Sequence, residues 1–155
     1  MSTIEKSINV DVPVRAAYDQ WTQFETFPEF MAGVESVRQV SDTLLHWTAE
    51  IGGVTREWHA EIVDQQPDER ITWRSVDGTT NAGTVSFAAV GTATRVTLRI
   101  EFEPEGIVEK AGDILHVIDR RTQGDLERFK AFIEDRLVPT GAWRGDVRPG
   151  DAPTA

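Results

Sequence analysis

IVEKAGDILHVIDRRTQGDLERFKAFIEDRL, residues 107–137, is the longest segment of the chain with a regular hydrophobic period. At 100° per residue, one set of side chains lies within about 60° of a single line along a helix. The set comprises Val108, Ala111, Leu115, Ile118, Thr122, Leu126, Phe129 and Ile133. The opposite face carries charges of both signs, which is typical of a helix face in water. The segment therefore predicts one amphipathic helix of about 31 residues, which would be about 46 Å long.

The residues before this helix follow the period of strands. Between residues 34 and 103, apolar and polar positions alternate in six segments separated by turn signals such as Gly52-Gly53, Pro67-Asp68 and Asp77-Gly78. Residues 4–12 alternate in the same way, and residues 14–31 have helical apolar spacing that Pro28 interrupts. The order is thus one strand, two short helices, six strands and the long helix.

This order predicts an α+β fold with one curved, antiparallel sheet of seven strands wrapped on the C-terminal helix, because only that helix is long enough to cover the sheet. A sheet curved in this way tends to leave a cavity suited to a small molecule. We expect the domain to cover residues 1–137. Residues 138–155 form a Pro- and Gly-rich tail in which only Trp143 is large and apolar, so the tail is either docked through Trp143 or flexible.

Composition excludes several classes of function. The chain has 155 residues, enough for one domain, and no cysteine, which excludes disulfides, zinc–thiolate sites and a thiol nucleophile. Sixteen Lys and Arg against 26 Asp and Glu give a net charge of −10, which disfavours binding to nucleic acid and to anionic membranes. Neither a signal peptide nor an apolar run of about 20 residues is visible, so we expect a cytoplasmic protein without membrane insertion.

Three tryptophans are the strongest candidates for ligand binding. Trp47, Trp58 and Trp73 lie on three successive strands, each at one of the alternate positions that are expected to face the inside of the sheet. They either fill the core or form a flat aromatic wall on which a planar ligand stacks. Cores of this size rarely need three tryptophans, since Leu or Ile packs more simply.

Parity also directs some polar side chains inward. Arg56 shares a face with Trp58, Asn81 shares one with Phe87, and Asp119 lies at the edge of the helix stripe that contains Thr122. The predicted ligand-binding set is Trp47, Trp58, Trp73, Asn81, Phe87 and Thr122.

The predicted catalytic pair is Arg56 as electrophile and Asp119 as base, with Asn81 orienting the substrate. The alternatives are that Arg56 and Asn81 lie at strand ends in solvent, that Asp119 forms a salt bridge to a strand, or that Arg56 and Asp119 pair with each other.

The three histidines give no support to a metal site. His46 and His59 have the opposite parity to the tryptophans, so they are expected to face outward, and His116 lies about 100° from the centre of the helix stripe. Because they are scattered and the chain has no cysteine, the sequence predicts no metal and no cofactor.

Several short motifs, in order, resemble one superfamily over about residues 4–137. They are Val12-Pro13, Trp21, Phe24, Phe27-Pro28, Glu57-Trp58, Ala60-Glu61, Pro67, Ile71, Trp73-Arg74, Asp125-Leu126, Phe129-Lys130 and Glu134. The chain resembles the helix-grip (SRPBCC) superfamily of START lipid-transfer domains, Bet v 1-like birch-pollen allergens and polyketide cyclases. Within it, the chain is most similar to the bacterial polyketide cyclase/dehydrase group, which is related to coenzyme Q-binding proteins.

The resemblance implies a pocket for a hydrophobic, aromatic or polyketide-like small molecule and a cyclase/dehydrase activity. It also implies an arginine on a central strand near Ile62, a position that is aliphatic here, so that Arg56 is the substitute. This departure favours the alternative of a non-catalytic carrier or chaperone for a lipid or quinone. A module that presses on a protein partner through its sheet is a third alternative, and a homodimer is compatible with the sequence.

Overall fold

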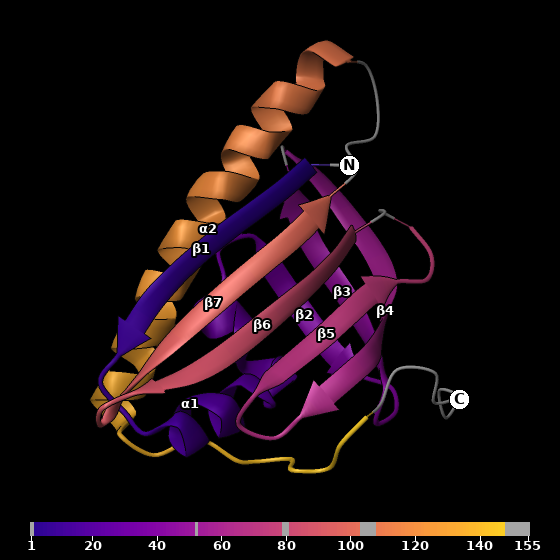
Figure 1. Ribbon diagram of the computed structural model, residues 1–155. Helices are drawn as coiled ribbons and strands as arrows, with labels where there is room; N and C mark the ends of the chain where they lie inside the picture. The colour runs from indigo at the N-terminus through magenta and orange to yellow at the C-terminus, as the bar shows by residue number, and fades with distance from the viewer. Residues whose placement is uncertain (1, 52, 79–80, 103–107, 148–155) are drawn as a thin grey trace.

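The computed structural model describes residues 2–51, 53–78, 81–102 and 108–147 (Figure 1). Its elements are β1 (Ser2–Val10), α1 (Val14–Trp21), the 3-10 helix η1 (Phe24–Glu29), β2 (Val34–Gln39), β3 (Leu44–Ile51), β4 (Val54–Gln66), β5 (Arg70–Ser75), β6 (Asn81–Val90), β7 (Ala93–Phe102) and α2 (Val108–Arg136). The predicted order of strand, two short helices, six strands and long helix is confirmed.

One antiparallel sheet contains all seven strands in the order β1-β7-β6-β5-β4-β3-β2. Each strand of the meander pairs with the next along the chain, and β1 closes the set by pairing with β7 from Ser2↔Phe102 to Val10↔Thr94. The sheet curls around α2, which runs along β1, as Figure 1 shows. The α+β helix-grip architecture predicted from the sequence is therefore confirmed.

The two short helices close one end of the curled sheet (Figure 1). Pro13 is the N-cap residue of α1, where its missing N–H costs nothing, and Pro28 lies inside η1. These helices carry the aromatic part of the core. Trp21 packs edge-to-face on Phe129 of α2, with 4.9 Å between the ring centroids, and on Phe27 of η1.

The apolar stripe of α2 is buried from Thr122 onward, and Ile118 before it is partly buried. Leu126, Phe129 and Ile133 are fully buried, and Thr122 is buried between them and the sheet. The stripe positions at residues 108, 111 and 115 lie outside the described side chains. Among the described residues, no helix combines the length and the apolarity needed to cross a bilayer.

Residues 138–147, here called the C-terminal strap, follow α2 and lie against α1 and β4. Val147 is buried and forms an isolated bridge with Gln65, with both backbone N–H···O distances between 2.7 and 2.8 Å. Trp143 packs against the core, and its backbone N–H donates to Thr22 Oγ1 at 3.1 Å. Of the two predicted alternatives for the tail, docking through Trp143 holds for these residues, and residues 148–155 lie outside the described part.

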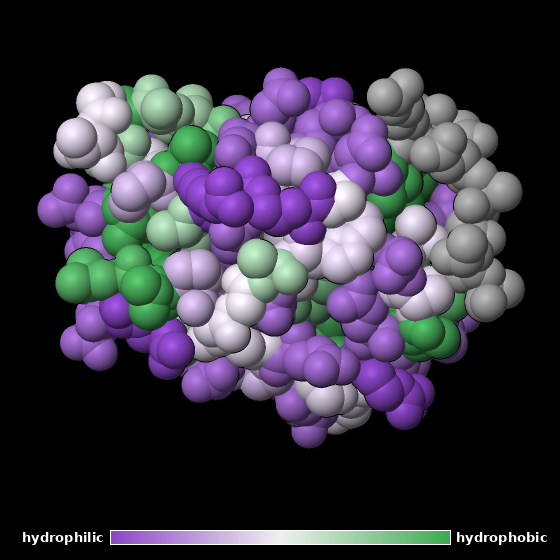
Figure 2. All heavy atoms as spheres, turned by 90° about the horizontal axis from the view of Figure 1, so that it is seen from below, coloured by the Kyte–Doolittle hydropathy of each residue, from purple (hydrophilic) through white to green (hydrophobic). Residues whose placement is uncertain are grey.

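The end of the molecule below the sheet is mostly hydrophilic, with hydrophobic residues in small separate patches (Figure 2). Among the residues whose side chains the structure describes, the large hydrophobic ones that are exposed are Val40, Val54, Val76, Val90, Leu137 and Val138. Scattered apolar residues of this kind are normal on a protein surface. In the described part of the chain, a substantial apolar concave surface lies inside the fold.

Candidate functional site

A cavity of about 160 Å³ lies between the inner face of the sheet and α2. The described residues that line it come from α1, η1, the loop between η1 and β2, α2 and every strand except β1. They are Trp21, Phe24, Phe27, Met31, Ala32, Val34, Leu45, Trp47, Ala49, Trp58, Ile62, Ile71, Trp73, Asn81, Leu98, Ile100, Phe102, Ile118, Arg121, Thr122 and Asp125. This lining is almost wholly apolar, so the cavity favours an apolar guest.

Three indoles form one wall of the cavity. Trp47 of β3 and Trp58 of β4 are direct partners across the strands, and their rings are stacked with 5.8 Å between centroids and 5° between planes. Trp73 follows on β5 and lies over Gly83 of β6, where an added Cβ would sit 2.4 Å from Trp73 Cζ2. The predicted inward orientation of all three is confirmed, and their contact with a ligand stays a prediction.

The aromatic residues of α1 and η1 extend this wall. Trp21, Phe24 and Phe27 line the cavity, and the Phe27 ring lies 5.6 Å from the Trp47 ring. The helical spacing of these side chains predicted their helices but did not assign them to the site. The signal that could have found them is the density of aromatic residues directly before β2.

Arg121 joins α2 to the β3–β4 hairpin at the edge of the cavity. Its Nη2 donates to Glu50 Oε2 at 2.8 Å, and its Nη1 donates to the Glu50 backbone carbonyl. The hydrogen bond from Arg121 is the main cause that lowers the pKa of Glu50, and the backbone N–H of Gly53 adds to it. The guanidinium is therefore already engaged in holding the helix to the hairpin.

Asp125 is a carboxyl group at the same edge. Its Oδ1 accepts hydrogen bonds from the backbone N–H of Ala32 at 2.8 Å and from Arg128 Nη2 at 2.6 Å. Burial raises the pKa of Asp125, since the cost of desolvating the charge exceeds the stabilisation from its partners. Asp125 can therefore hold a proton at a higher pH than a surface aspartate.

Two further polar residues of the lining were predicted. Asn81 lines the cavity at the start of β6, and its backbone N–H donates to Ser75 Oγ at 3.0 Å. Thr122 lines it from α2, and its Oγ1 donates to the Ile118 carbonyl at 2.7 Å. The hydroxyl proton of Thr122 is thus used within the helix.

Arg56, Asp119 and Phe87 are not among the described residues that line the cavity. Arg56 shares the inner face with Trp58, but it pairs with Ala49, nearer the β3–β4 turn. Asp119 is 44% exposed and forms an ion pair with Lys6 of β1 at 3.1 Å, which is the predicted alternative of a salt bridge to a strand. Phe87 is buried in the core. The structure therefore does not assemble the predicted catalytic pair around the cavity.

Phe87 and Ile62 both have buried side chains, but only Ile62 lines the cavity. The Phe87 ring packs edge-to-face on Tyr18 of α1, with 5.5 Å between centroids, at the end of the sheet that α1 closes. Ile62 lies in the cavity wall, so the position where the resemblance implied an arginine presents an aliphatic side chain to a ligand. Neither His46 nor His59 is among the lining residues, as their parity predicted.

The two histidines are not scattered, however. His46 and His59 are direct partners across β3 and β4, with 4.9 Å between their ring centroids. The prediction of scatter was wrong because it considered distance along the chain alone. Once Trp47 faces Trp58 in a hairpin, the residues before and after them must face each other as well.

Comparison with known proteins agrees with this architecture. Residues 10–131 match the family model described as polyketide cyclase / dehydrase and lipid transport. An uncharacterized 17.2 kDa protein of Streptomyces lincolnensis, from the melC2-rnhH intergenic region, is 52% identical over 149 residues, which is 95% of this chain and 99% of that protein.

Solved structures show the same fold at low sequence identity. The Zhui aromatase/cyclase from Streptomyces sp. R1128 superposes with a TM-score of 0.77 at 14% identity, covering 92% of this chain and 99% of that one. A START superfamily protein from Mycobacterium smegmatis gives 0.69 at 14% identity, with 87% and 96% covered. The family match spans most of the sequence, and its elements are those that build the cavity. The chain belongs to the polyketide cyclase / dehydrase and lipid transport family.

Proposed function

We propose that this protein binds a planar, largely apolar small molecule in the cavity between the sheet and α2. The observation that carries the proposal is the wall formed by Trp47, Trp58 and Trp73. Flat aromatic faces pack well on a flat ligand and poorly on a branched one. The apolar lining excludes a strongly charged ligand, because a charge moved there would lose its hydration without a free partner.

The volume of the cavity limits the size of its guest. An apolar cavity of about 150 Å³ is known to hold a benzene molecule, and the cavity here is about 160 Å³. One ring, or two fused rings after small side-chain movements, fits this space. A longer polycyclic or polyketide chain requires α2 or the aromatic side chains to move outward.

One donor in the wall lacks a partner. The indole Nε1 of Trp47 is buried and has no hydrogen-bond partner among the described residues. Buried indole N–H groups normally find an acceptor, and leaving one unsatisfied costs about 1–3 kcal/mol. A ligand with an oxygen attached to its ring, such as a phenol or a quinone, could accept this hydrogen bond.

The arrangement supports a carrier more strongly than an enzyme. Arg121, Thr122 and Asp125 Oδ1 already make hydrogen bonds within the protein. A cyclase must polarise a ketone and remove a proton from the neighbouring carbon. Ile62 offers neither function.

A cyclase/dehydrase activity is the second candidate, and Asp125 is the observation that favours it. A carboxyl group at the cavity with a raised pKa is better matched to acid–base chemistry near neutral pH than a surface aspartate. The similarity of fold to an aromatase/cyclase supports the same candidate.

Calorimetric titration with 1-naphthol, compared with the saturated decahydro-1-naphthol, tests the binding proposal. We expect 1-naphthol to bind more tightly, and Trp73→Leu to weaken it by up to about tenfold, which corresponds to the 0.5–1.5 kcal/mol of an aromatic pair. Trp143→Phe is the matched control, because Trp143 lies in the strap and not in the lining. Equal affinity for the two alcohols, or no binding of either, would contradict the proposal.

Incubation of the pure protein with a poly-β-ketone separates the two candidates. Turnover that Asp125→Asn abolishes, while 1-naphthol binding persists, would establish the enzyme. Binding without turnover in the wild-type protein would establish the carrier.

A further inference from the structure

A second cluster of chemically active side chains lies on the opposite face of the sheet from the cavity. His46 of β3, Glu57 and His59 of β4, and Asp77 after β5 gather around a shallow hollow, with Gly78 and the backbone side of Trp58 completing its lining. Their rings and carboxylates are partly exposed, so the hollow is open to small solutes. The binding of a planar apolar molecule makes no use of this cluster.

The two imidazoles are held side by side by the sheet itself. His46 and His59 occupy directly paired positions on β3 and β4, and their ring centroids are 4.9 Å apart. Pairing across two strands within a seven-stranded sheet fixes the separation of their Cα atoms, so neither ring has to be ordered by a ligand. The rings are 20% and 38% exposed, which leaves their outer edges accessible.

Each ring is also held by a carboxylate through one nitrogen. His59 Nδ1 lies 2.8 Å from Asp77 Oδ2, and His46 Nε2 lies 3.3 Å from Glu57 Oε1. An ionised carboxylate only accepts hydrogen bonds, so in a neutral imidazole the proton stays on the nitrogen that faces it. The lone pairs therefore remain on His59 Nε2 and His46 Nδ1.

The contact of each ring with a carboxylate is one that metal-binding histidines show. A carboxylate that accepts the hydrogen bond of one ring nitrogen fixes the tautomer and makes the other nitrogen a better ligand. Imidazole nitrogen suits zinc, nickel and copper, whereas calcium and magnesium prefer oxygen. Glu57 and Asp77 also place negative charge beside the hollow, which favours a cation there.

We propose that His46 and His59 form a binding site for a divalent transition-metal ion of the zinc or nickel type, with Glu57 and Asp77 as the positioning partners of the two rings. Water completes the coordination shell, because no group of three or more His, Cys, Asp or Glu in the described part of the chain is placed to hold a metal ion. The site therefore binds its metal more weakly than a closed structural zinc site and remains open to exchange.

Calorimetric titration of the untagged, chelator-treated full-length protein with ZnCl₂ tests the proposal. We expect one site per chain, at least a tenfold loss of affinity in either His46→Gln or His59→Gln, and no measurable site in the double variant. His116→Gln is the matched control, since His116 is an exposed histidine on α2. Failure of the wild-type protein to bind zinc, or unchanged affinity in both single variants, would overturn the proposal.

A positioning variant provides an independent readout. Asp77→Asn keeps an oxygen that accepts the backbone N–H of His59, a bond of 2.6 Å, but removes the carboxylate from the ring. We expect zinc affinity to fall by about 10–100-fold, the effect typical of losing such a partner. An unchanged affinity would mean that Asp77 only holds the turn against β4.

A measurement on the wild-type protein protects the test from variants that fold poorly. Substoichiometric Cu²⁺ should broaden the ring proton signals of His46 and His59 in nuclear magnetic resonance spectra before those of His116. Equal broadening of all three signals would show that the pair chelates no better than a single surface imidazole and would overturn the proposal.

Discussion

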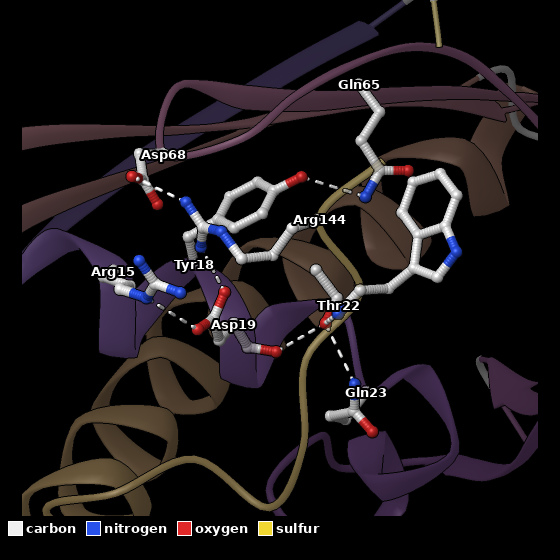
Figure 3. A network of polar contacts seen from close by, with 9 residues as sticks. Arg15, Tyr18, Asp19, Thr22, Gln23, Gln65, Asp68 and Arg144 are labelled. Atoms are coloured by element: carbon white, nitrogen blue, oxygen red, sulfur yellow. Dashed lines mark hydrogen bonds and ion pairs between the residues drawn. The ribbon is translucent and has the colours of Figure 1, made fainter. Parts of the chain in front are cut away.

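The cavity and the docking site of the C-terminal strap both lie against the same sheet, yet the two regions are built from opposite kinds of side chain. The cavity is walled by aromatic and aliphatic groups and leaves room for a guest. Beside α1, a polar clamp formed by Asp19, Asp68 and Arg144 joins that helix to the β4–β5 turn and the strap (Figure 3). Arg144 Nη2 lies 2.8 Å from Asp68 Oδ2, and its Nη1 donates to Asp19 Oδ1.

Residues next to the polar clamp make further polar contacts. The Arg144 guanidinium lies 5.6 Å from the centre of the Tyr18 ring, and the Tyr18 hydroxyl accepts a hydrogen bond of 3.0 Å from Gln65. Burial raises the pKa of Tyr18, so the phenol stays neutral. Gln20, in turn, bonds both the hydroxyl and the backbone N–H of Thr140 in the strap.

This difference in side chains explains why the cavity contains free volume and the polar clamp does not. An apolar wall tolerates a vacancy at the cost of lost packing, whereas a buried polar group without a partner costs about 1–3 kcal/mol. The polar clamp must therefore be filled by protein, and the strap fills it. We accordingly expect substitutions in the cavity wall to change ligand binding, and substitutions in the clamp to change stability alone.

Removing the most buried of the three indoles in the cavity wall should have the largest effect. Trp58 is 8% exposed and stacks on Trp47. We expect Trp58→Ala to lower the free energy of unfolding by about 3–5 kcal/mol, as for other buried aromatic truncations, and to weaken 1-naphthol binding. Urea unfolding followed by titration of the folded fraction measures both, and unchanged binding would make Trp58 a core residue rather than part of the wall.

Breaking the polar clamp should lower the free energy of unfolding and leave ligand binding unchanged. Arg144→Met leaves Asp19, whose side chain is 8% exposed, with Arg15 at 3.8 Å as its remaining cation. We expect a loss of about 3 kcal/mol, the lower end of the range for breaking a buried ion pair, with unchanged 1-naphthol affinity. The control Arg15→Met, at a side chain that is 71% exposed, should cost less than about 1 kcal/mol.

A weakened 1-naphthol affinity in Arg144→Met would break the comparison between the two regions. It would mean that the strap shapes the cavity from a distance.

Gly83 tests how the wall is shaped. A methyl group added there would meet the Trp73 ring, so Gly83→Ala should push that indole toward the cavity. We expect a cost of about 1–3 kcal/mol for overpacking and a weaker affinity for 1-naphthol. Ala88→Val, on the exposed part of the same strand, is the control and should leave the affinity unchanged.

The smallest effect concerns the charge of the cavity carboxyl group. The pKa of Asp125 is raised in the folded state, so between its unfolded value of about 3.9 and its folded value the native state binds more protons than the unfolded state. Stability contributed by this group is therefore present below about pH 3.9 and is lost as the pH rises through the folded pKa.

The matched variant isolates this contribution. The unfolding free energy of the wild type minus that of Asp125→Asn should fall as the pH rises from about 3.9, by at most about 1.4 kcal/mol for each unit of pKa shift, and then level off. Urea unfolding at a series of pH values measures the difference. A difference that stays constant would mean that the carboxyl group is as well solvated as a surface aspartate.

The periodicity of the sequence was sufficient for the fold and for the aromatic wall. Alternation over residues 44–51 and 54–66 places Trp47 and Trp58 on one face, and the Gly52-Gly53 turn between them makes them partners. The same strand register pairs His46 with His59. The register of a hairpin thus follows from local pattern and turn position.

The polar residues of the site required more than periodicity. At 100° per residue, Asp119 and Asp125 lie about 60° from Thr122 on opposite sides of the stripe, so the helical pattern treats them alike. Packing decides between them. The Asp119 side of α2 faces Lys6 of β1, while Arg121 and Asp125 lie on the side that meets β3 and the loop at Ala32.

The contacts of the strap could not be predicted from the sequence for a related reason. Its composition is that of a tail, and nothing near Arg144 in the sequence identifies Asp19, which lies 125 positions away. Only the assembled domain brings these two residues together. Long-range polar contacts of this kind leave no local pattern.

That separation also sets an order of events during synthesis. A ribosome makes α1 before any residue of the strap. Asp19 and Gln20 therefore stay hydrated until their partners Arg144 and Thr140 are made, about 120 residues later. Because chains emerge from the N-terminus at about 5–20 residues per second, this end of the domain stays open for several seconds after α1 has been made. A nascent chain paused just after α2 should therefore display an unfinished helix surface that chaperones or proteases can recognise, although every strand of the sheet has already been made.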